Sequence, residues 1–96
     1  MFARSSTWTG SQDEIERWTE HVAKKVGPMV AGIPGSAGAY FFVDRDAGRA
    51  LTLTLWENEE AALASDATAE QSRESTIAAT GIQLVERGRY EVVGRV

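Results

Sequence analysis

Residues 50–61, Ala-Leu-Thr-Leu-Thr-Leu-Trp-Glu-Asn-Glu-Glu-Ala, predict a β-strand followed at once by a helix. Leucines alternate with threonines and a final tryptophan from Ala50 to Trp56, so the strand has one aliphatic face and one face of mixed character. Asn58 is a favourable N-cap, and the two glutamates after it oppose the dipole of the helix.

The residues before this stretch predict a strand, a helix and a second strand. Residues 2–9 alternate as a strand does, and Gly10 ends them. Ser11 and Glu14 form a capping box for a helix, which Gly27-Pro28 is expected to stop or kink. The apolar stripe of that helix has the spacing of three and four residues and consists of Ile15, Trp18, Val22, Val26 and Met29. Residues 32–36 are expected to form a loop, residues 37–43 a strand and residues 44–48 a hairpin turn.

The residues after it predict a long helix and a last strand. The helix is expected over residues 59–80, with a break near Ser65-Asp66, and should bury mainly Leu63, Ile77 and several alanines. Gly81 suits its C-terminal end, and residues 82–96 form a final extended segment with a bulge or bend at Gly88. The order strand, helix, strand, strand, helix, strand is that of an α+β, ferredoxin-like sandwich, here a single domain over residues 1–96.

Composition and charge restrict the class of protein. Its 96 residues are 43% apolar and 25% charged, which excludes a disordered chain, a collagen-like repeat and a coiled-coil rod. The net charge is −4 and the basic residues are scattered, so we expect no nucleic-acid partner. Cysteine is absent, which excludes disulfides and thiolate metal sites. No signal-peptide core or membrane span is visible, so a cytoplasmic location without membrane association is the default expectation.

The strand at residues 37–43 indicates a partner. Tyr40 and Phe42 point to one face of the sheet and Phe41 and Val43 to the other, and all four are apolar or aromatic. Two helices cover only one face of a four-stranded sheet. We therefore expect a second copy of the chain on the other face, giving a homodimer. The alternative is that one of these phenylalanines is an ordinary exposed aromatic residue.

Two features suggest a binding site. His21 is the only side chain that titrates near neutral pH without perturbation, and it lies at the edge of the apolar helix stripe, where it could act as a general base. The alternative is a boundary histidine without a role. The aromatic residues could line an apolar cavity for a flat aromatic or lipid-like ligand, or simply build the core. They are Trp8, Trp18, Tyr40, Phe42, Trp56 and Tyr90.

Two other motifs have ordinary structural explanations. The glycines at 32, 35 and 38 precede a strand and not a helix, so they do not form a phosphate loop. Asp44 and Asp46 flank a turn, where aspartate is a favoured residue, and we predict no metal site.

The stretch over residues 50–61, and above all Leu55 to Ala61, resembles the third strand and the following helix start of the antibiotic-biosynthesis monooxygenase family. That family consists of dimeric α+β barrels. The resemblance implies that Thr52, Thr54 and Trp56 face a pocket between helices and sheet, while the leucine row lines a barrel shared with the partner. A one-sided sheet would instead place the leucines under the helices.

The resemblance also implies residue roles. Trp56 matches the pocket tryptophan of cofactor-free oxygenases in this family, and Arg73 is the counterpart of an arginine on their second helix. Thr52 stands where those enzymes have asparagine, and Ala62 where they have tyrosine. A haem-ligating histidine on the second helix has no counterpart, because the only histidine lies on the first.

The function that follows from the resemblance is that of a cofactor-independent monooxygenase-like protein acting on an aromatic or polyketide-type small molecule. Trp56, Trp18, Tyr40 and Thr52 would bind the substrate, and His21 and Arg73 would be the catalytic residues. No cofactor and no metal is expected. The alternative is a non-catalytic protein of the same dimeric fold that binds a small ligand.

Overall fold

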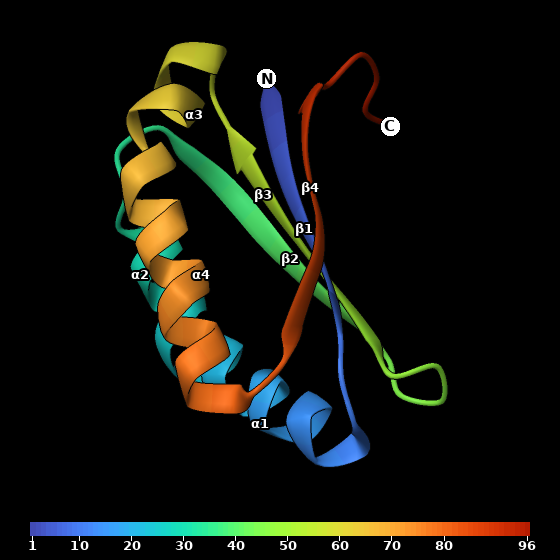
Figure 1. Ribbon diagram of the computed structural model, residues 1–96. Coiled ribbons are helices and arrows are strands. Elements are labelled where there is room, and N and C mark those ends of the chain that lie inside the picture. The colour runs from blue at the N-terminus through green and yellow to red at the C-terminus, as the bar shows by residue number, and fades with distance from the viewer.

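The computed structural model describes all 96 residues as a four-stranded antiparallel sheet with helices on one face (Figure 1). The strand order is β2-β3-β1-β4, and the sheet is not closed. The predicted α+β, ferredoxin-like fold is therefore confirmed. None of the helices has the length and apolar character needed to cross a membrane. The elements are β1 (Phe2–Thr9), α1 (Gln12–His21), the π-helix η1 (Val22–Val26), α2 (Gly27–Ala31), β2 (Ser36–Asp44), β3 (Arg49–Trp56), α3 (Glu59–Ala64), α4 (Asp66–Thr80) and β4 (Gln83–Glu91).

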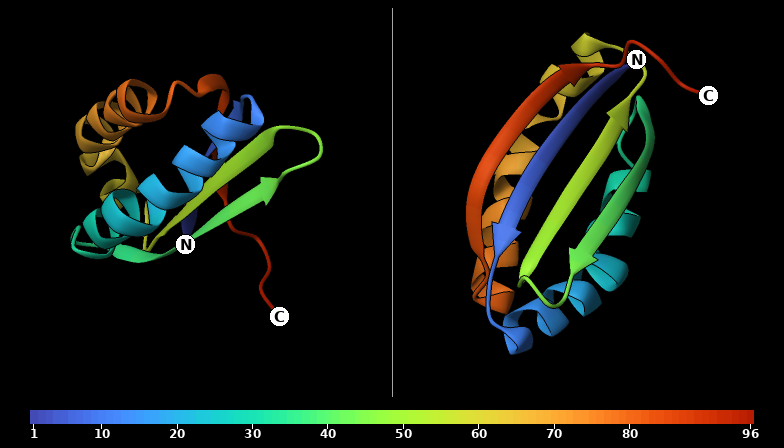
Figure 2. Two further views of the ribbon diagram at one scale, coloured as in Figure 1. Left: turned by 90° about the horizontal axis from the view of Figure 1, so that it is seen from below. Right: turned by 90° about the vertical axis from the view of Figure 1, so that its right-hand side faces the viewer.

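The two faces of the sheet have different surroundings. The helices cover one face, and the right-hand view of Figure 2 looks onto the other, which nothing in this chain covers. Phe41 and Val43 of β2 pack against the helix-side core, and the ring of Phe41 meets that of Trp18 edge-on at 6.3 Å. Tyr40 and Phe42 lie on the uncovered face, stacked at 6.0 Å and about half exposed. The predicted alternation along this strand is thus confirmed.

The first helical segment runs past Gly27-Pro28 to Ala31, so of the two expected outcomes, a stop or a kink, the stop does not occur. Both hydrogen bonds of the capping box formed by Ser11 and Glu14 are present. The segment accommodates the proline by widening into the π-helix η1 just before it, with the Gly27 N–H bonded to the Val22 carbonyl. Pro28 then stands in the first turn of α2, where a missing N–H costs little.

The break in the second helical region lies at Ser65, as predicted, but the residues it buries differ from those expected. Leu63 and Ile77 are 50% and 39% exposed, whereas Thr76 and Thr80 are buried. These hydroxyls are buried at low cost because each donates to a carbonyl one turn earlier. The Thr76 Oγ1 bonds to Ser72 O at 2.9 Å and the Thr80 Oγ1 to Thr76 O at 2.7 Å.

The irregularity in β4 is not at Gly88, which corrects the sequence-based expectation. The register shifts opposite Thr7 and Trp8 of β1. Gly88 has another role, because a Cβ atom there would lie 2.5 Å from the hydroxyl oxygen of Tyr90 and 2.6 Å from its ring. The missing side chain lets the Tyr90 ring lie flat over the uncovered face of the sheet.

Gly35 joins the loop before β2 to α3, and we predict that Gly35→Ala destabilises the protein. Gly35 has a φ of +82°, and an added Cβ would lie 2.5 Å from the Cβ of Ala61. Strain and steric overlap should together lower the free energy of unfolding by about 1–3 kcal/mol, measured by urea denaturation. Gly32→Ala is the control, because Gly32 has a φ of −87° and its nearest neighbour is at 3.6 Å. Equal losses in the two variants would contradict the prediction.

Candidate functional site

A cavity of about 50 Å³ lies between the helices and the covered face of the sheet. All three tryptophans of the chain line it, Trp8 and Trp56 from the sheet and Trp18 from α1. Val22 and Val26 of the π-helix η1 also line it, and π-helical turns occur often at functional sites. The remaining lining residues are Arg4, Ser6, Met29, Val30, Ile33, Thr52, Thr54, Ala69, Ser72, Arg73 and Thr76. The cavity is therefore apolar and aromatic, with polar groups at a few positions.

The threonines of β3 fix two of the indole rings. Trp8 Nε1 donates to Thr52 Oγ1 at 3.2 Å, and Trp56 Nε1 donates to Thr54 Oγ1 at 3.0 Å. Because both threonines lie on the helix-facing side of β3, the leucine row between them lies on the uncovered face. Thr52, Thr54 and Trp56 therefore face the helices, as the resemblance implies, and the alternative with leucines under the helices is wrong.

Trp18 differs from the other two tryptophans. It is 1% exposed, and its Nε1–H has no hydrogen-bond partner. A buried donor without a partner is costly and uncommon in native proteins. The ring is held by packing alone, including the edge-on contact with Phe41.

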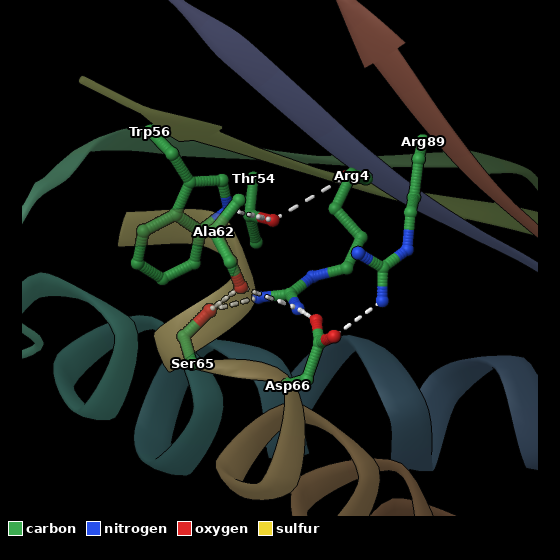
Figure 3. A network of polar contacts seen from close by, with 7 residues as sticks. All are labelled: Arg4, Thr54, Trp56, Ala62, Ser65, Asp66 and Arg89. Carbon is green, nitrogen blue, oxygen red and sulfur yellow. Dashed lines mark hydrogen bonds and ion pairs between the residues drawn. The ribbon is translucent and has the colours of Figure 1, made fainter. Parts of the chain in front are cut away.

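Arg4 of β1 lines the cavity with a charged side chain, and Figure 3 shows its polar contacts. Its guanidinium donates to the carboxylate of Asp66, to the hydroxyl of Ser65 and, at 3.3 Å, to the carbonyl of Ala62. The Arg4 guanidinium carbon also lies 5.1 Å from the centroid of the Trp56 ring, a cation–π contact. Burial lowers the pKa of Arg4 and the charge of Asp66 opposes this shift, so the side chain stays protonated.

Asp66 joins two arginines. One carboxylate oxygen accepts from Arg4 of β1 and the other from Arg89 of β4 (Figure 3). The hydrogen bond from Arg89, with the charges of Arg89 and Arg4, holds the pKa of Asp66 below its usual value. This carboxylate therefore ties the start of α4 to two neighbouring strands.

Arg73 of α4 lines the same cavity and has no ion pair. Burial lowers the pKa of Arg73, and the neighbouring positive charge of Arg87 lowers it further. A partly buried guanidinium without a carboxylate partner is available to a negative charge on a ligand.

His21 lies outside the cavity, in a groove between the first helical segment and α4. Its Nε2 is 3.1 Å from Thr76 Oγ1, and the Thr76 hydroxyl donates its only proton to the Ser72 carbonyl. With the Thr76 hydroxyl donating to Ser72, the tautomer of His21 that carries its proton on Nε2 satisfies this contact. Burial, with the charge of Lys25, lowers the pKa of His21 and so favours the neutral imidazole. This geometry does not present a base to the cavity.

The structure brings together four of the six residues predicted for the site. Trp18, Thr52, Trp56 and Arg73 all line the cavity. His21 reaches it only through Thr76. Tyr40 lies on the opposite face of the sheet, 54% exposed, because it is one residue out of phase with the inward-facing Phe41. The expectation that Tyr40 walls this cavity is corrected.

Arg4, Ser65 and Asp66 were not predicted from the sequence. A signal for Arg4 was present, because it shares a strand face with Trp8, and an arginine on a buried face needs an acidic partner. That partner lies 62 positions further along the chain, and no local pattern relates the two. No group of three or more histidine, cysteine, aspartate or glutamate side chains could hold a metal ion.

No protein-family model matches the chain. Uncharacterized protein Rv2557 of Mycobacterium tuberculosis is 35% identical over 65 residues, a match that covers 68% of this chain. The match covers only 29% of that protein, so this chain corresponds to a minor part of a longer relative.

Several solved structures share the whole fold at low sequence identity. One is a putative antibiotic biosynthesis monooxygenase from Deinococcus radiodurans, with a TM-score of 0.80, 14% identity and coverage of 100% of this chain and 96% of that one. Another is the ActVA-Orf6 monooxygenase of Streptomyces coelicolor with its ligand nanaomycin D, with a TM-score of 0.75, 16% identity and coverage of 99% and 89%. A third is SnoaB, a cofactor-independent oxygenase of Streptomyces nogalater, with a TM-score of 0.64, 17% identity and coverage of 99% and 93%.

A dimeric ferredoxin-like protein from an uncultured marine organism is also similar, with a TM-score of 0.74, 12% identity and coverage of 99% of this chain and 96% of that one. The chain thus has the fold of antibiotic biosynthesis monooxygenases, which supports the resemblance that its β3 sequence indicated. At these sequence identities the similarity shows the fold alone, and any reaction depends on the residues of the site.

We predict that Asp66→Asn lowers the free energy of unfolding at pH 7 by about 1–3 kcal/mol, because two arginines lose a charged acceptor. The folded-state pKa of Asp66 lies below its unfolded-state value. Its stabilising effect is therefore present above the unfolded pKa of about 3.9 and is lost as the pH falls through the folded pKa. The difference between variant and wild type should shrink below about pH 4.

Urea denaturation between acidic and neutral pH measures this difference. Glu20→Gln is the matched control, because it removes a carboxylate from an exposed ion pair with Lys24 and should have a far smaller effect. A difference between Asp66→Asn and wild type that stays constant down to strongly acidic pH would show that the charge of Asp66 is not the cause.

Proposed function

We propose that the chain is a cofactor-independent monooxygenase-like protein that acts on an aromatic or polyketide-type small molecule. The observation that carries this proposal is the cavity of three tryptophans bordered by two arginines, within a fold shared with such oxygenases. Flat apolar walls suit an aromatic ring, and guanidinium groups stabilise negative charge that develops on it.

The reaction proposed begins with loss of a proton from a carbon next to an aromatic carbonyl. The electron pair left behind spreads onto the oxygen, where Arg73 and Arg4 stabilise the charge. The carbanion gives an electron to dioxygen, and the two combine into a peroxide. Protonation of the peroxide and loss of water leave a new carbonyl, so one oxygen atom enters the product and the other leaves as water.

The first step needs a proton acceptor, and no carboxylate or imidazole lines the cavity. We propose that the arginines lower the pKa of the bound substrate enough for water to take the proton. His21 then acts as a positioning residue, since its Nε2–H holds the Thr76 hydroxyl at the cavity wall.

The size of the cavity limits the substrate. Its volume of about 50 Å³ is far below the roughly 300–1,000 Å³ of sites that enclose drug-sized ligands. Met29 and Ile33 line both this cavity and a larger hollow beside Pro34 and Ala61. Because methionine side chains are flexible, a turn of Met29 is the smallest movement that would join the two spaces.

We predict dioxygen uptake by the protein with a panel of anthrone-like phenols, measured with an oxygen electrode. Arg73→Gln should lower kcat by roughly 100-fold, as loss of one group that stabilises an oxyanion does. Arg95→Gln removes the same charge from the chain terminus and should leave uptake unchanged. Trp56→Phe keeps an aromatic wall and should retain folding, which Trp56→Ala endangers because the ring is fully buried. Uptake by Arg73→Gln equal to that of wild type would refute the role of this arginine.

A non-catalytic ligand-binding protein is the second candidate function, favoured by the small cavity and by the absence of a base at its wall. Thr52 and Ala62 also stand where the cofactor-free oxygenases have asparagine and tyrosine. Intrinsic fluorescence separates the two candidates, since all three tryptophans border the cavity. Quenching by a phenol without dioxygen uptake would favour binding alone.

We also propose that the uncovered face of the sheet is the interface of a homodimer. Tyr40, Phe42 and Tyr90 are about half exposed there, beside the leucine row of β3. Apolar surface of this kind is unusual on a protein that stays a monomer. The similarity to a dimeric ferredoxin-like protein supports the same assembly.

For this dimer we predict a mass of twice the 10.4 kDa chain in light scattering at micromolar concentration. Phe42→Glu should give the mass of one chain, because it buries a charge in the interface. Leu63→Glu is matched to it, since Leu63 on α3 is 50% exposed against 48% for Phe42 but lies away from the interface. A wild-type mass of one chain would refute the assembly.

A further inference from the structure

A second hollow, of about 480 Å³, lies beside the cavity between β1, β4 and α4. No hydrophobic side chain lines it. Arg4 and Arg73 line both spaces, so the hollow adjoins the polar end of the tryptophan cavity. Its charged residues are Arg4, Arg73, Arg87, Arg89, Asp66 and Glu70.

The hollow concentrates positive charge on a chain whose net charge is −4. Four of the ten basic residues meet here with only two carboxylates, which leaves a local excess of two positive charges. Arg4 and Arg89 stand directly opposite each other on neighbouring strands. Like charges at such positions repel, so the arrangement destabilises the fold unless an anion lies between them.

Asp66 forms ion pairs with only two of the four arginines in this cluster. It bonds to Arg4 and Arg89, and neither Arg73 nor Arg87 has an ion pair within 4.0 Å. Glu70 also lines the hollow, and its charge raises the pKa of Arg73, but it forms no ion pair either. Arg73 and Arg87 are close enough for the charge of Arg87 to lower the pKa of Arg73. Both guanidinium groups line the same hollow and have no carboxylate partner, and guanidinium groups bind oxyanions through paired N–H donors.

We propose that this hollow is a binding site for an oxyanion, a carboxylate or a phosphate group, held between Arg73 and Arg87. Arg4 and Arg89, fixed by Asp66, supply positive potential behind it. The oxyanion is either the acid group of a ligand whose apolar part enters the tryptophan cavity, or a free anion. This site does not depend on the proposed oxygenase reaction, because anion binding can be measured in the absence of dioxygen uptake.

Isothermal titration calorimetry at low ionic strength tests the site with three probes: 1-naphthoate, its uncharged analogue 1-naphthamide, and inorganic phosphate. We expect 1-naphthoate to bind at least about tenfold more tightly than 1-naphthamide. The double variant Arg73→Gln/Arg87→Gln should abolish this difference, and Arg95→Gln should preserve it. Tighter binding of 1-naphthoate than of phosphate identifies the acid group of a larger ligand, and equal binding identifies a free anion.

Two results would overturn the proposal: absence of binding of either anion to the wild-type protein, or unchanged anion binding by the double variant. If the double variant does not fold, Arg87→Gln alone decides, because Arg87 is exposed and has no side-chain hydrogen bond. Arg87→Lys should retain part of the affinity, since it keeps the charge without the fork. Anion binding without dioxygen uptake would refute the proposed oxygenase reaction and leave this site standing.

Discussion

The burial of Arg4 under the sheet is the constraint on which the arrangement of the site depends. A guanidinium in this position needs several acceptors, and they come from three places: the end of α3, the residue between the helices and the start of α4. The hydrogen bonds that satisfy the Arg4 guanidinium therefore determine where the helical region breaks and how α4 lies across β1. The same contacts place Trp56 under the guanidinium and give the cavity its charged border.

Much of the fold could be predicted from the sequence, because its signals are local. The capping box at Ser11 and Glu14 needs only four residues, and the alternation along β3 needs only eight. Alternation alone does not tell which face of β3 meets the helices. The family resemblance of residues 55–61 predicted that the threonine face does. Trp18, Thr52 and Trp56 were found in this way, since each position follows from one periodic element or one short motif, whereas Arg73 came only from the family resemblance.

The features that were not predicted have causes that the type of residue alone does not reveal. Thr76 and Thr80 look polar in the sequence, yet they are buried because each hydroxyl bonds within its own helix. The bulge in β4 depends on its register with β1 and does not lie at Gly88, where it was predicted. Tyr40 was assigned to the cavity for its aromatic character, whereas its phase along β2 sends it to the other face.

The two proposals use opposite faces of the sheet, and on the helix side the charged residues relate stability to the proposed anion binding. Asp66 acts as a built-in anion for Arg4 and Arg89, while Arg73 and Arg87 keep their repulsion. An oxyanion in the hollow would reduce this repulsion and would therefore bind the folded state more strongly than the unfolded one. Such binding raises the free energy of unfolding by mass action. Because Arg4 lines both spaces, a ligand that filled them would also be expected to strengthen the packing of β1 against α4.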